Sequence, residues 1–127
     1  MNKYTFTKTF TFDEQDLVDI ISSAIYDIGY WACIDNDTDV WNKTSDSLDD
    51  DHTFEDVFFE ILKNKQEVCL IDVEDDEEVW ELTLDKLLHG MQLAIDNNYW
   101  DGDIDSLDGQ VGDIIFQYAL FEEIVFG

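Results

Sequence analysis

The net charge of this chain of 127 residues limits which of its segments can form a core. It carries 32 Asp and Glu side chains against six Lys and no Arg, so its formal net charge is −26 at pH 7. Carboxylates without partners are very costly to bury, and six cations can pair with only a few of them. The core must therefore come from the apolar segments that alternate with the acidic ones, and the surface must carry nearly all of the charge.

The composition nevertheless supports a folded domain. Hydrophobic residues make up 45% of the chain and aromatic residues 14%, which argues against disorder. The length fits one domain over 1–127, and no linker-like stretch divides it. Residues 1–12 do not resemble a signal peptide, and no apolar run is long enough to cross a membrane. The cysteines, Cys33 and Cys69, have no metal-site spacing, so we expect free thiols in the cytoplasm of a host cell.

The apolar spacing predicts a small α+β domain, with an antiparallel sheet of three to four strands packed against three to four helices. Alternation of aromatic residues with threonine over 4–12 predicts a half-buried strand. Two more strands are expected at 67–73 and 78–82, joined by an acidic turn at 74–77. The apolar tail at 124–126 is a candidate for a fourth strand.

Apolar residues at helical spacing indicate four helices, and residues that commonly cap a helix precede three of them. Asp13, Thr53 and Thr83 are of the types preferred at helix N-caps, and Gly29 is a natural stop for the first helix. The predicted helices cover 14–28, 53–65, 83–96 and 111–120.

The acidic residues concentrate in three segments between the apolar elements. Residues 35–56 hold nine acids against Lys43, residues 72–81 hold seven, and residues 96–113 hold six without a basic residue. Connecting segments lie at the surface. If the three segments lie on one side of the fold, they form a continuous negative surface.

The density of this charge is close to that of a nucleic acid. A compact chain of this length has a diameter of roughly 36 Å, so 26 charges correspond to about one per 1.4 Å, against about one per 1.7 Å for duplex DNA. We therefore predict a DNA mimic whose partner is a basic nucleic-acid-binding protein, with no direct binding to nucleic acid or membrane. Adaptation to high salt would also explain the acids, but not the many large aromatic residues.

Metal binding is the closest competing hypothesis. The two D-x-D-x-D runs at 35–39 and 101–105 match the first three ligand positions of an EF-hand loop. Neither run continues the pattern, because the sixth position holds Val40 or Ser106 where Gly is needed. We expect no cofactor and no dedicated calcium site, and keep weak divalent-cation binding as an alternative.

Enzymatic activity is not expected. The two histidines, His52 and His89, have the character of packed or surface residues, and no phosphate-binding loop, nucleophile elbow or metalloprotease motif is present. The absence of Arg removes the usual anchor for anionic substrates.

The tryptophans divide into two groups. Trp31 and Trp80 are expected in the core. Trp41 and Trp100 lie in Asp-rich stretches without an apolar period, so we expect one of them to be an exposed interface anchor. The candidate partner-binding residues are Asp35, Asp37, Asp39, Trp41, Asp49, Asp50, Asp51, Asp75, Asp76, Glu77, Glu78, Trp100, Asp101, Asp103 and Asp105.

Two segments, ELTLDKLLHG at 81–90 and IFQYALFEEIVFG at 115–127, resemble those of small acidic proteins carried by phages and mobile elements of Gram-positive bacteria. In charge and size the chain is also similar to phage-encoded DNA mimics, among them anti-CRISPR and anti-restriction proteins. This likeness shares no motif, so no functional residue is carried over from it.

The resemblance implies a non-enzymatic inhibitor of a host defence protein, a CRISPR effector first and a restriction enzyme second. Two further alternatives are a phage structural or assembly protein that offers the tail at 124–126 to a partner, and the weak divalent-cation binder. Whether the chain is a monomer or a dimer stays open.

Overall fold

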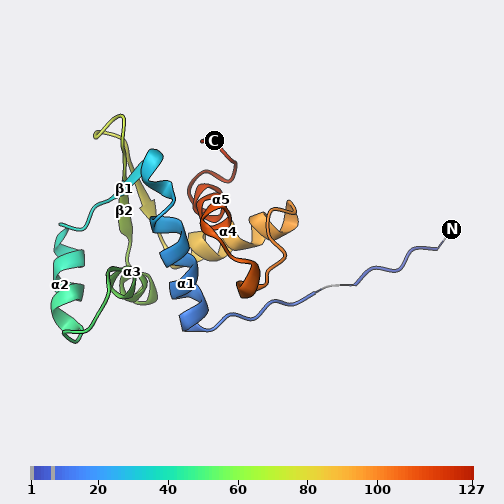
Figure 1. The fold of residues 1–127 in the computed structure, drawn as a ribbon, viewed down its shortest axis with the longest axis horizontal. Coiled ribbons are helices and arrows are strands. Elements are labelled where there is room, and N and C mark those ends of the chain that lie inside the picture. The colour runs from blue at the N-terminus through green and yellow to red at the C-terminus, as the bar shows by residue number, and fades with distance from the viewer. Residues whose placement is uncertain (1, 7) are drawn as a thin grey trace.

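The computed structural model describes residues 2–6 and 8–127 and is a small α+β domain (Figure 1). Its sheet has three antiparallel strands, β1 (Ala32–Ile34), β2 (Val68–Asp72) and β3 (Val79–Leu82). Five α-helices accompany it, not three to four: α1 (Glu14–Ile25), α2 (Asp39–Ser47), α3 (Phe54–Lys63), α4 (Leu84–Asp96) and α5 (Gly109–Phe121). Two short 3₁₀ turns, Ile28–Tyr30 and Ile104–Ser106, precede β1 and α5.

The sheet has the order β1-β2-β3. The predicted hairpin is confirmed as β2 and β3, with Leu70 opposite Trp80. β1 was not anticipated, and it pairs with β2 in a register that sets Cys33 opposite Ile71. Val68, Leu70 and Leu82 are buried on the face turned to the helices, so the sheet contributes one side of the core.

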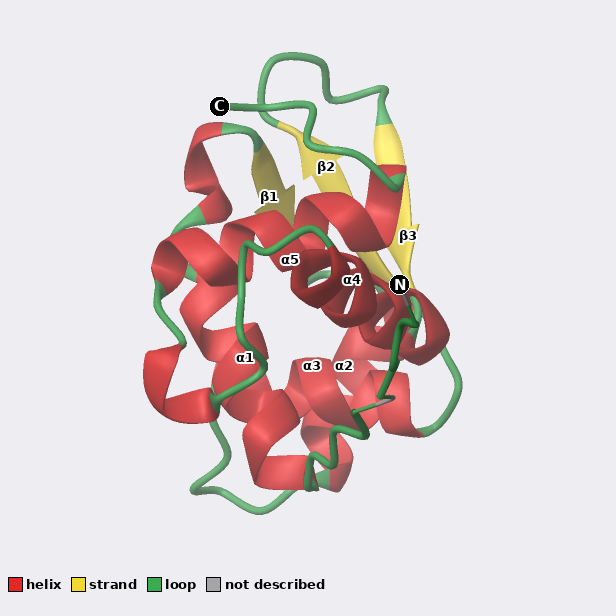
Figure 2. Cartoon of the chain, turned by 90° about the vertical axis from the view of Figure 1, so that its right-hand side faces the viewer, coloured by secondary structure: helices red, strands yellow, loops and turns green. Residues whose placement is uncertain are grey.

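Helix α5 lies at the centre of the helical layer. It packs against α4 and α1 and also contacts β3, while α3 packs against α1 and α2; Figure 2 shows this cluster of helices beside the sheet. Ile115 and Phe116 of α5 are fully buried. Close approach to α4 depends on Gly90, since a Cβ there would lie only 2.5 Å from the Ile115 carbonyl oxygen.

Helix starts follow the predicted caps. Asp13 and Thr53 each form a reciprocal capping box at the start of α1 and α3, and Thr83 accepts a hydrogen bond from the Lys86 amide at the start of α4. These side chains satisfy backbone N–H groups that the first helical turn leaves free. In the described part of the chain, no helix combines the length and apolar character needed to cross a membrane.

The N-terminal arm, residues 2–6 and 8–12, is not the half-buried strand that its alternation predicts. Thr7, which belongs to that predicted strand, lies outside the described residues, as does Met1. Only the base of the arm packs, with the Phe12 ring stacked on Trp100 at 5.6 Å between centroids. Tyr4 and Phe6 are 82% and 92% exposed. The prediction was wrong because a strand also needs a partner strand, and none of the described residues supplies one here.

The C-terminal tail is likewise not a strand. Its backbone is tied to α5, since the Gln117 Oε1 atom accepts hydrogen bonds from the Val125 and Phe126 amides at 2.8 and 2.7 Å. The Phe126 ring stacks on Trp31 with centroids 5.0 Å apart. Phe126 is therefore packed within this chain, whereas Ile124 and Val125 stay exposed.

Candidate functional site

The carboxylates lie at the surface, as the charge of the chain requires. Of the 32 acidic residues, all of them described, only Asp113 is buried. Lys63 and Glu14 form a salt bridge at 2.9 Å between two half-exposed side chains, the one Lys–carboxylate pair among the described residues. Very little of the negative charge is thus neutralised within the molecule.

Two groups of acids lie on the left in Figure 1, one on α2 and its flanking loops and the other at the hairpin turn between β2 and β3. We call these two groups together the acidic edge. Its members are Asp35, Asp37, Asp39, Asp46, Asp49, Asp50, Asp51, Glu74, Asp75, Asp76, Glu77 and Glu78. All but the half-buried Asp35 are exposed.

Much of this charge lies at the two ends of α2. Seven acids of the acidic edge lie on this helix or on the loops at its ends, against Lys43. The helix itself carries Asp39, Asp46 and Lys43, a net charge of −1, and the other five acids lie on the loops. Residues 35–51 together thus carry a net charge of −6.

Backbone amides of the loops donate hydrogen bonds to the acids and fix the shape of the acidic edge. Asp35 accepts a hydrogen bond from the Asp37 amide at 3.1 Å, Asp49 from the Asp51 amide at 3.2 Å, and Asp75 from the Glu77 amide at 3.1 Å. An Asp side chain that binds the amide two residues later stabilises a turn. The acidic edge is therefore presented by turns of defined geometry.

The third acidic segment lies elsewhere. The loop between α4 and α5 is on the other side of α1 in Figure 1, so the three segments do not form one continuous surface. Here Asp101 accepts hydrogen bonds from the Ser106 hydroxyl at 2.6 Å and the Asp103 amide at 2.9 Å. These bonds, the Ser106 bond foremost, hold the pKa of Asp101 below its ordinary value.

Two carboxyl groups, those of Glu67 and Glu81, lie close together at the sheet. The Glu67 carboxyl hydrogen bonds with that of Glu81, and this bond together with the negative charge of Glu81 raises the pKa of Glu67. A carboxylate that lies against another favours protonation. The positive charge of Lys86 offsets part of this effect on the pKa of Glu67.

Neither Trp41 nor Trp100 is an exposed anchor, contrary to the prediction. Trp41 is 6% exposed and its ring lies 4.6 Å from that of Phe54. Trp100 is 5% exposed, stacks on Phe12, and donates from its indole nitrogen to the Asp103 carbonyl oxygen at 3.0 Å. Both bury large apolar rings beneath acidic loops and so support those loops. Trp31 is buried and Trp80 half-buried, as expected.

The D-x-D-x-D runs are explained by turn formation. In each run the first Asp accepts a hydrogen bond from the amide of the second, and Asp103 accepts another from the Asp105 amide at 2.9 Å. Within the described residues, no three His, Cys, Asp or Glu side chains come together in an arrangement that could hold a metal ion. The spacing therefore has a structural cause that requires no ligand.

Comparison of the chain with protein-family models, with curated proteins and with solved structures gave no match.

Sequence reasoning missed the environment of Asp113, which it assigned to the third acidic segment. The Asp113 carboxylate accepts hydrogen bonds from the Tyr30 hydroxyl at 2.6 Å, the Trp31 indole at 2.8 Å and the Gln117 amide at 2.9 Å. Burial and the bond to Asp113 raise the pKa of Tyr30 to about 12. This carboxylate is a structural link between α5 and the segment before β1, and no signal in the sequence marks it.

A Ser–His contact is also present at the acidic edge. The Ser45 hydroxyl lies 3.0 Å from His52 Nε2, and His52 Nδ1 contacts the Asp49 carbonyl oxygen. The adjoining hollow is lined by Asp49, Asp56 and Glu60 among others. Carboxylates there would destabilise an oxyanion, whereas a reactive serine needs groups that stabilise one. The contact joins α2 to the loop before α3 and is consistent with a structural role.

Proposed function

We propose that this protein is a non-enzymatic DNA mimic that occupies the DNA-binding groove of a host defence protein. A CRISPR effector is the first candidate for that target and a restriction enzyme the second. The observation that carries the proposal is the acidic edge, which presents twelve carboxylates, eleven of them exposed, with almost no internal neutralisation.

In this mechanism the carboxylates of the acidic edge replace phosphates. They pair with Lys and Arg side chains of the target that would otherwise bind the DNA backbone, so the protein and DNA compete for one groove. Binding must then weaken as salt concentration rises. The large net charge steers a basic partner to the acidic edge and accelerates association.

A pull-down from a bacterial lysate at low salt tests the proposal. Bound proteins are eluted with a rising salt gradient, identified by mass spectrometry, and then challenged with duplex DNA. We expect a CRISPR or restriction component that elutes with salt and is displaced by DNA. A partner that resists salt and ignores DNA would instead favour an assembly or structural role.

Two matched variants locate the contact. The first replaces Asp49, Asp50 and Asp51 of the acidic edge by Asn, and the second replaces Asp101, Asp103 and Asp105 by Asn. Each removes three negative charges, but only the first lies on the acidic edge. We expect the first variant to lose much more affinity for the target, and equal losses would contradict the assignment of the contact to this edge.

Calorimetry distinguishes the DNA mimic from the alternative of a weak divalent-cation binder. A ligand that binds only the folded state raises the midpoint temperature of thermal unfolding. If calcium raised that midpoint for the wild type and not for the Asp101, Asp103 and Asp105 variant, the loop would be a cation site and the weak-binder alternative would gain support. We expect no such difference between the two proteins.

A further inference from the structure

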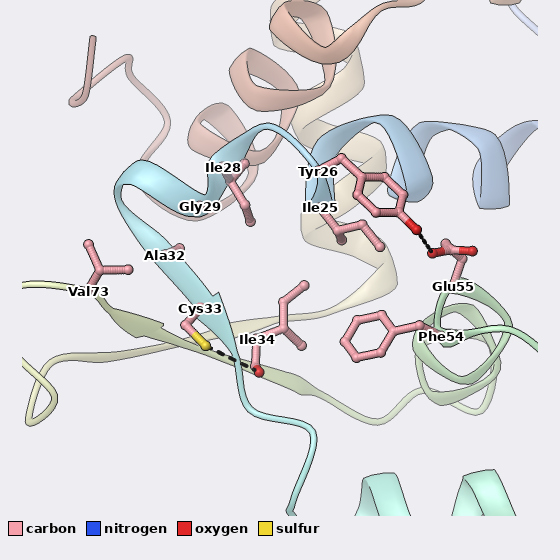
Figure 3. A pocket seen from close by; sticks show the side chains of 10 residues that line it. All are labelled: Ile25, Tyr26, Ile28, Gly29, Ala32, Cys33, Ile34, Phe54, Glu55 and Val73. Atoms are coloured by element: carbon pink, nitrogen blue, oxygen red, sulfur yellow. Dashed lines mark hydrogen bonds between the residues drawn. The ribbon is translucent and has the colours of Figure 1, made fainter.

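An apolar hollow opens beside β1. Its volume is about 560 Å³, and Figure 3 shows the side chains of Ile25 and Tyr26 from the end of α1, Phe54 from α3, and Ala32 and Ile34 from β1 around it. Glu55 is at the rim, where it accepts a hydrogen bond from the Tyr26 hydroxyl at 3.4 Å. A hollow of this size and character accommodates a large apolar side chain.

The backbone beside this hollow is an open sheet edge. The Val73 amide donates to the Trp31 carbonyl oxygen at 3.2 Å, and the Asp35 amide donates to the Cys69 carbonyl oxygen at 2.9 Å. In an antiparallel ladder this pattern turns the backbone groups of Ala32 and Ile34 away from β2. Among the described residues, no strand lies on that side of β1. Such an edge can accept a further strand.

The N-terminal arm has the properties of that missing strand. Its residues alternate between aromatic side chains and threonine, a pattern typical of strands, and Tyr4 and Phe6 are left exposed. The arm extends away from the body of the molecule in Figure 1. Residues 1–12 contain Lys3, Lys8 and no acid, whereas residues 13–127 contain all 32 acids and only four lysines.

We propose that the N-terminal arm of a second copy of this chain adds to β1 as an antiparallel strand, with Phe6 in the hollow, and that two copies exchange arms in this way to form a dimer. The inference does not rest on the proposed function. In this dimer the arm fills the hollow and pairs with the open edge of β1, and the exposed aromatic residues of the arm become buried.

The side-chain faces of the two segments match. Ala32 and Ile34 lie on the face of β1 that continues into the core, whereas Cys33 lies on the opposite face and is exposed. The hollow reaches around the sheet edge, so Cys33 lines it as well. A register with Thr5 opposite Cys33 sets Phe6 opposite Ala32 and Tyr4 opposite Ile34. Both aromatic side chains then point to the hollow, and Thr5 points to the outer face with Cys33.

Charge favours this occupant over an acidic segment. The hollow has Glu55 at its rim, and Asp27 and Asp35 stand next to its lining residues in the chain. The arm brings lysines to this acidic rim. Repulsion between two chains of charge −26 opposes the dimer, but at physiological salt it is screened beyond about 8 Å, whereas the contacts of the arm are within that distance.

Sedimentation velocity at physiological salt, from low to high micromolar protein, tests the proposal. We expect the wild type to dimerise, and Phe6→Ser to weaken dimerisation by roughly tenfold or more because a buried aromatic side chain is lost. Thr5→Ser is the matched control on the other face of the arm and should leave the dimer intact.

A variant of the hollow tests the receiving side. Gly29 lines the hollow and a Cβ there would meet no atom within 4 Å, so we expect the side chain of Gly29→Leu to occupy part of the hollow without disturbing the core. We expect this variant to be monomeric with an unchanged thermal midpoint of the folded monomer, and Gly29→Ala to remain a dimer. A monomeric wild type, or a dimer that persists in both Phe6→Ser and Gly29→Leu, would overturn the proposal.

Disulfide trapping tests the register. In a Cys69→Ser background, Thr5→Cys stands opposite Cys33 at a pair without backbone hydrogen bonds, where Cα atoms are about 4.5 Å apart and a disulfide fits. We expect oxidation to give a covalent dimer joined between positions 5 and 33. Thr9→Cys in the same background is the control, and equal cross-linking from position 9 would contradict the register.

Discussion

Trp31 donates a hydrogen bond from its indole nitrogen to the Asp113 carboxylate at 2.8 Å, across 82 positions of the chain. Gln117, one turn further along α5, binds the same carboxylate and also holds the backbone of Val125 and Phe126. Trp31 in turn stacks on Phe126. This group of polar contacts inside the core therefore connects the segment before β1, helix α5 and the C-terminal tail.

Loss of the Asp113 carboxylate should strongly destabilise the fold. Asp113→Ala leaves the buried Trp31 indole without an acceptor and removes one partner each from Tyr30 and Gln117, and we expect the free energy of unfolding to fall by about 2–4 kcal/mol. Asp113→Asn retains an acceptor oxygen and should lose less. Urea denaturation measures both values, with Asp105→Ala as a control that removes the same charge from an exposed site. A loss in Asp113→Ala no larger than in that control would contradict the role of the network.

The Tyr30 hydroxyl should titrate at an unusually high pH. Its pKa is raised from 10.0 to about 12, first by burial and then by the bond to Asp113. Because the pKa is higher in the folded state, the stabilisation is fully present below pH 10 and is lost as the pH rises from about 10 to about 12. An ultraviolet titration of the wild type, compared with that of Tyr30→Phe, isolates this phenol. In Asp113→Ala the pKa of Tyr30 should move back toward 10.

Gly90 should tolerate no larger side chain. In Gly90→Ala the Cβ atom would lie 2.5 Å from the Ile115 carbonyl oxygen and 2.7 Å from the Ala119 amide nitrogen. Backbone atoms cannot rotate away, so α4 and α5 must separate, and we expect the free energy of unfolding to fall by about 1–3 kcal/mol. Gly29→Ala, whose Cβ meets no atom within 4 Å, should change it by about 0.5 kcal/mol or less. Thermal denaturation compares the two, and similar losses would refute the close contact of the helices.

Salt should stabilise this protein. With one Lys–carboxylate ion pair among the described residues and a net charge of −26, repulsion between carboxylates opposes the folded state. Raising the ionic strength from about 0.01 M to about 0.15 M shortens the Debye length from about 30 Å to about 8 Å, so the thermal midpoint should rise. The Asp49, Asp50 and Asp51 variant with three Asn residues should show a higher midpoint at low salt and a smaller salt effect. A midpoint independent of salt would exclude repulsion as a significant force here.

The elements that sequence reasoning identified are those with local signals. Helices α1, α3, α4 and α5 have apolar residues at helical spacing, and the first three begin at the expected caps. The hairpin of β2 and β3 has its acidic turn, and its strands pair directly with one another. In each case the residues that determine the element are close together in the chain.

The elements that were missed depend on distant partners. β1 has only three residues, and its pairing with β2 is made across the chain from Asp35 to Glu67. Helix α2 is largely polar, with Trp41 and Thr44 as its buried residues, so its apolar period is too weak to detect. The arm shows the opposite case, since its strand pattern is strong but no strand of the described chain pairs with it.

In the candidate site, too, local features were predicted and features that depend on distant contacts were missed. The sequence predicted the charge, the grouping of the acids into three segments, and a surface position for the acids that is wrong only for Asp113. The packing of the helices determines which acidic segments lie on the same side of the molecule. Because of this packing, residues 101–105 lie apart from the other two segments. Trp41 and Trp100 are buried by rings from other parts of the chain, Phe54 and Phe12, which no local period indicates.

The order of strands also has a consequence for how the molecule folds. β2 and β3 are joined by the six residues from Val73 to Glu78, whereas 33 residues, from Asp35 to Glu67, separate β1 from β2. The entropy lost in closing a loop increases with its length, so the hairpin can form early, and β1 can join it only after the chain that contains α2 and α3 has been brought back. The β1–β2 pairing can therefore open while the β2–β3 hairpin stays closed. Amide hydrogens of β2 that face β1 should then exchange with solvent more readily than those that face β3.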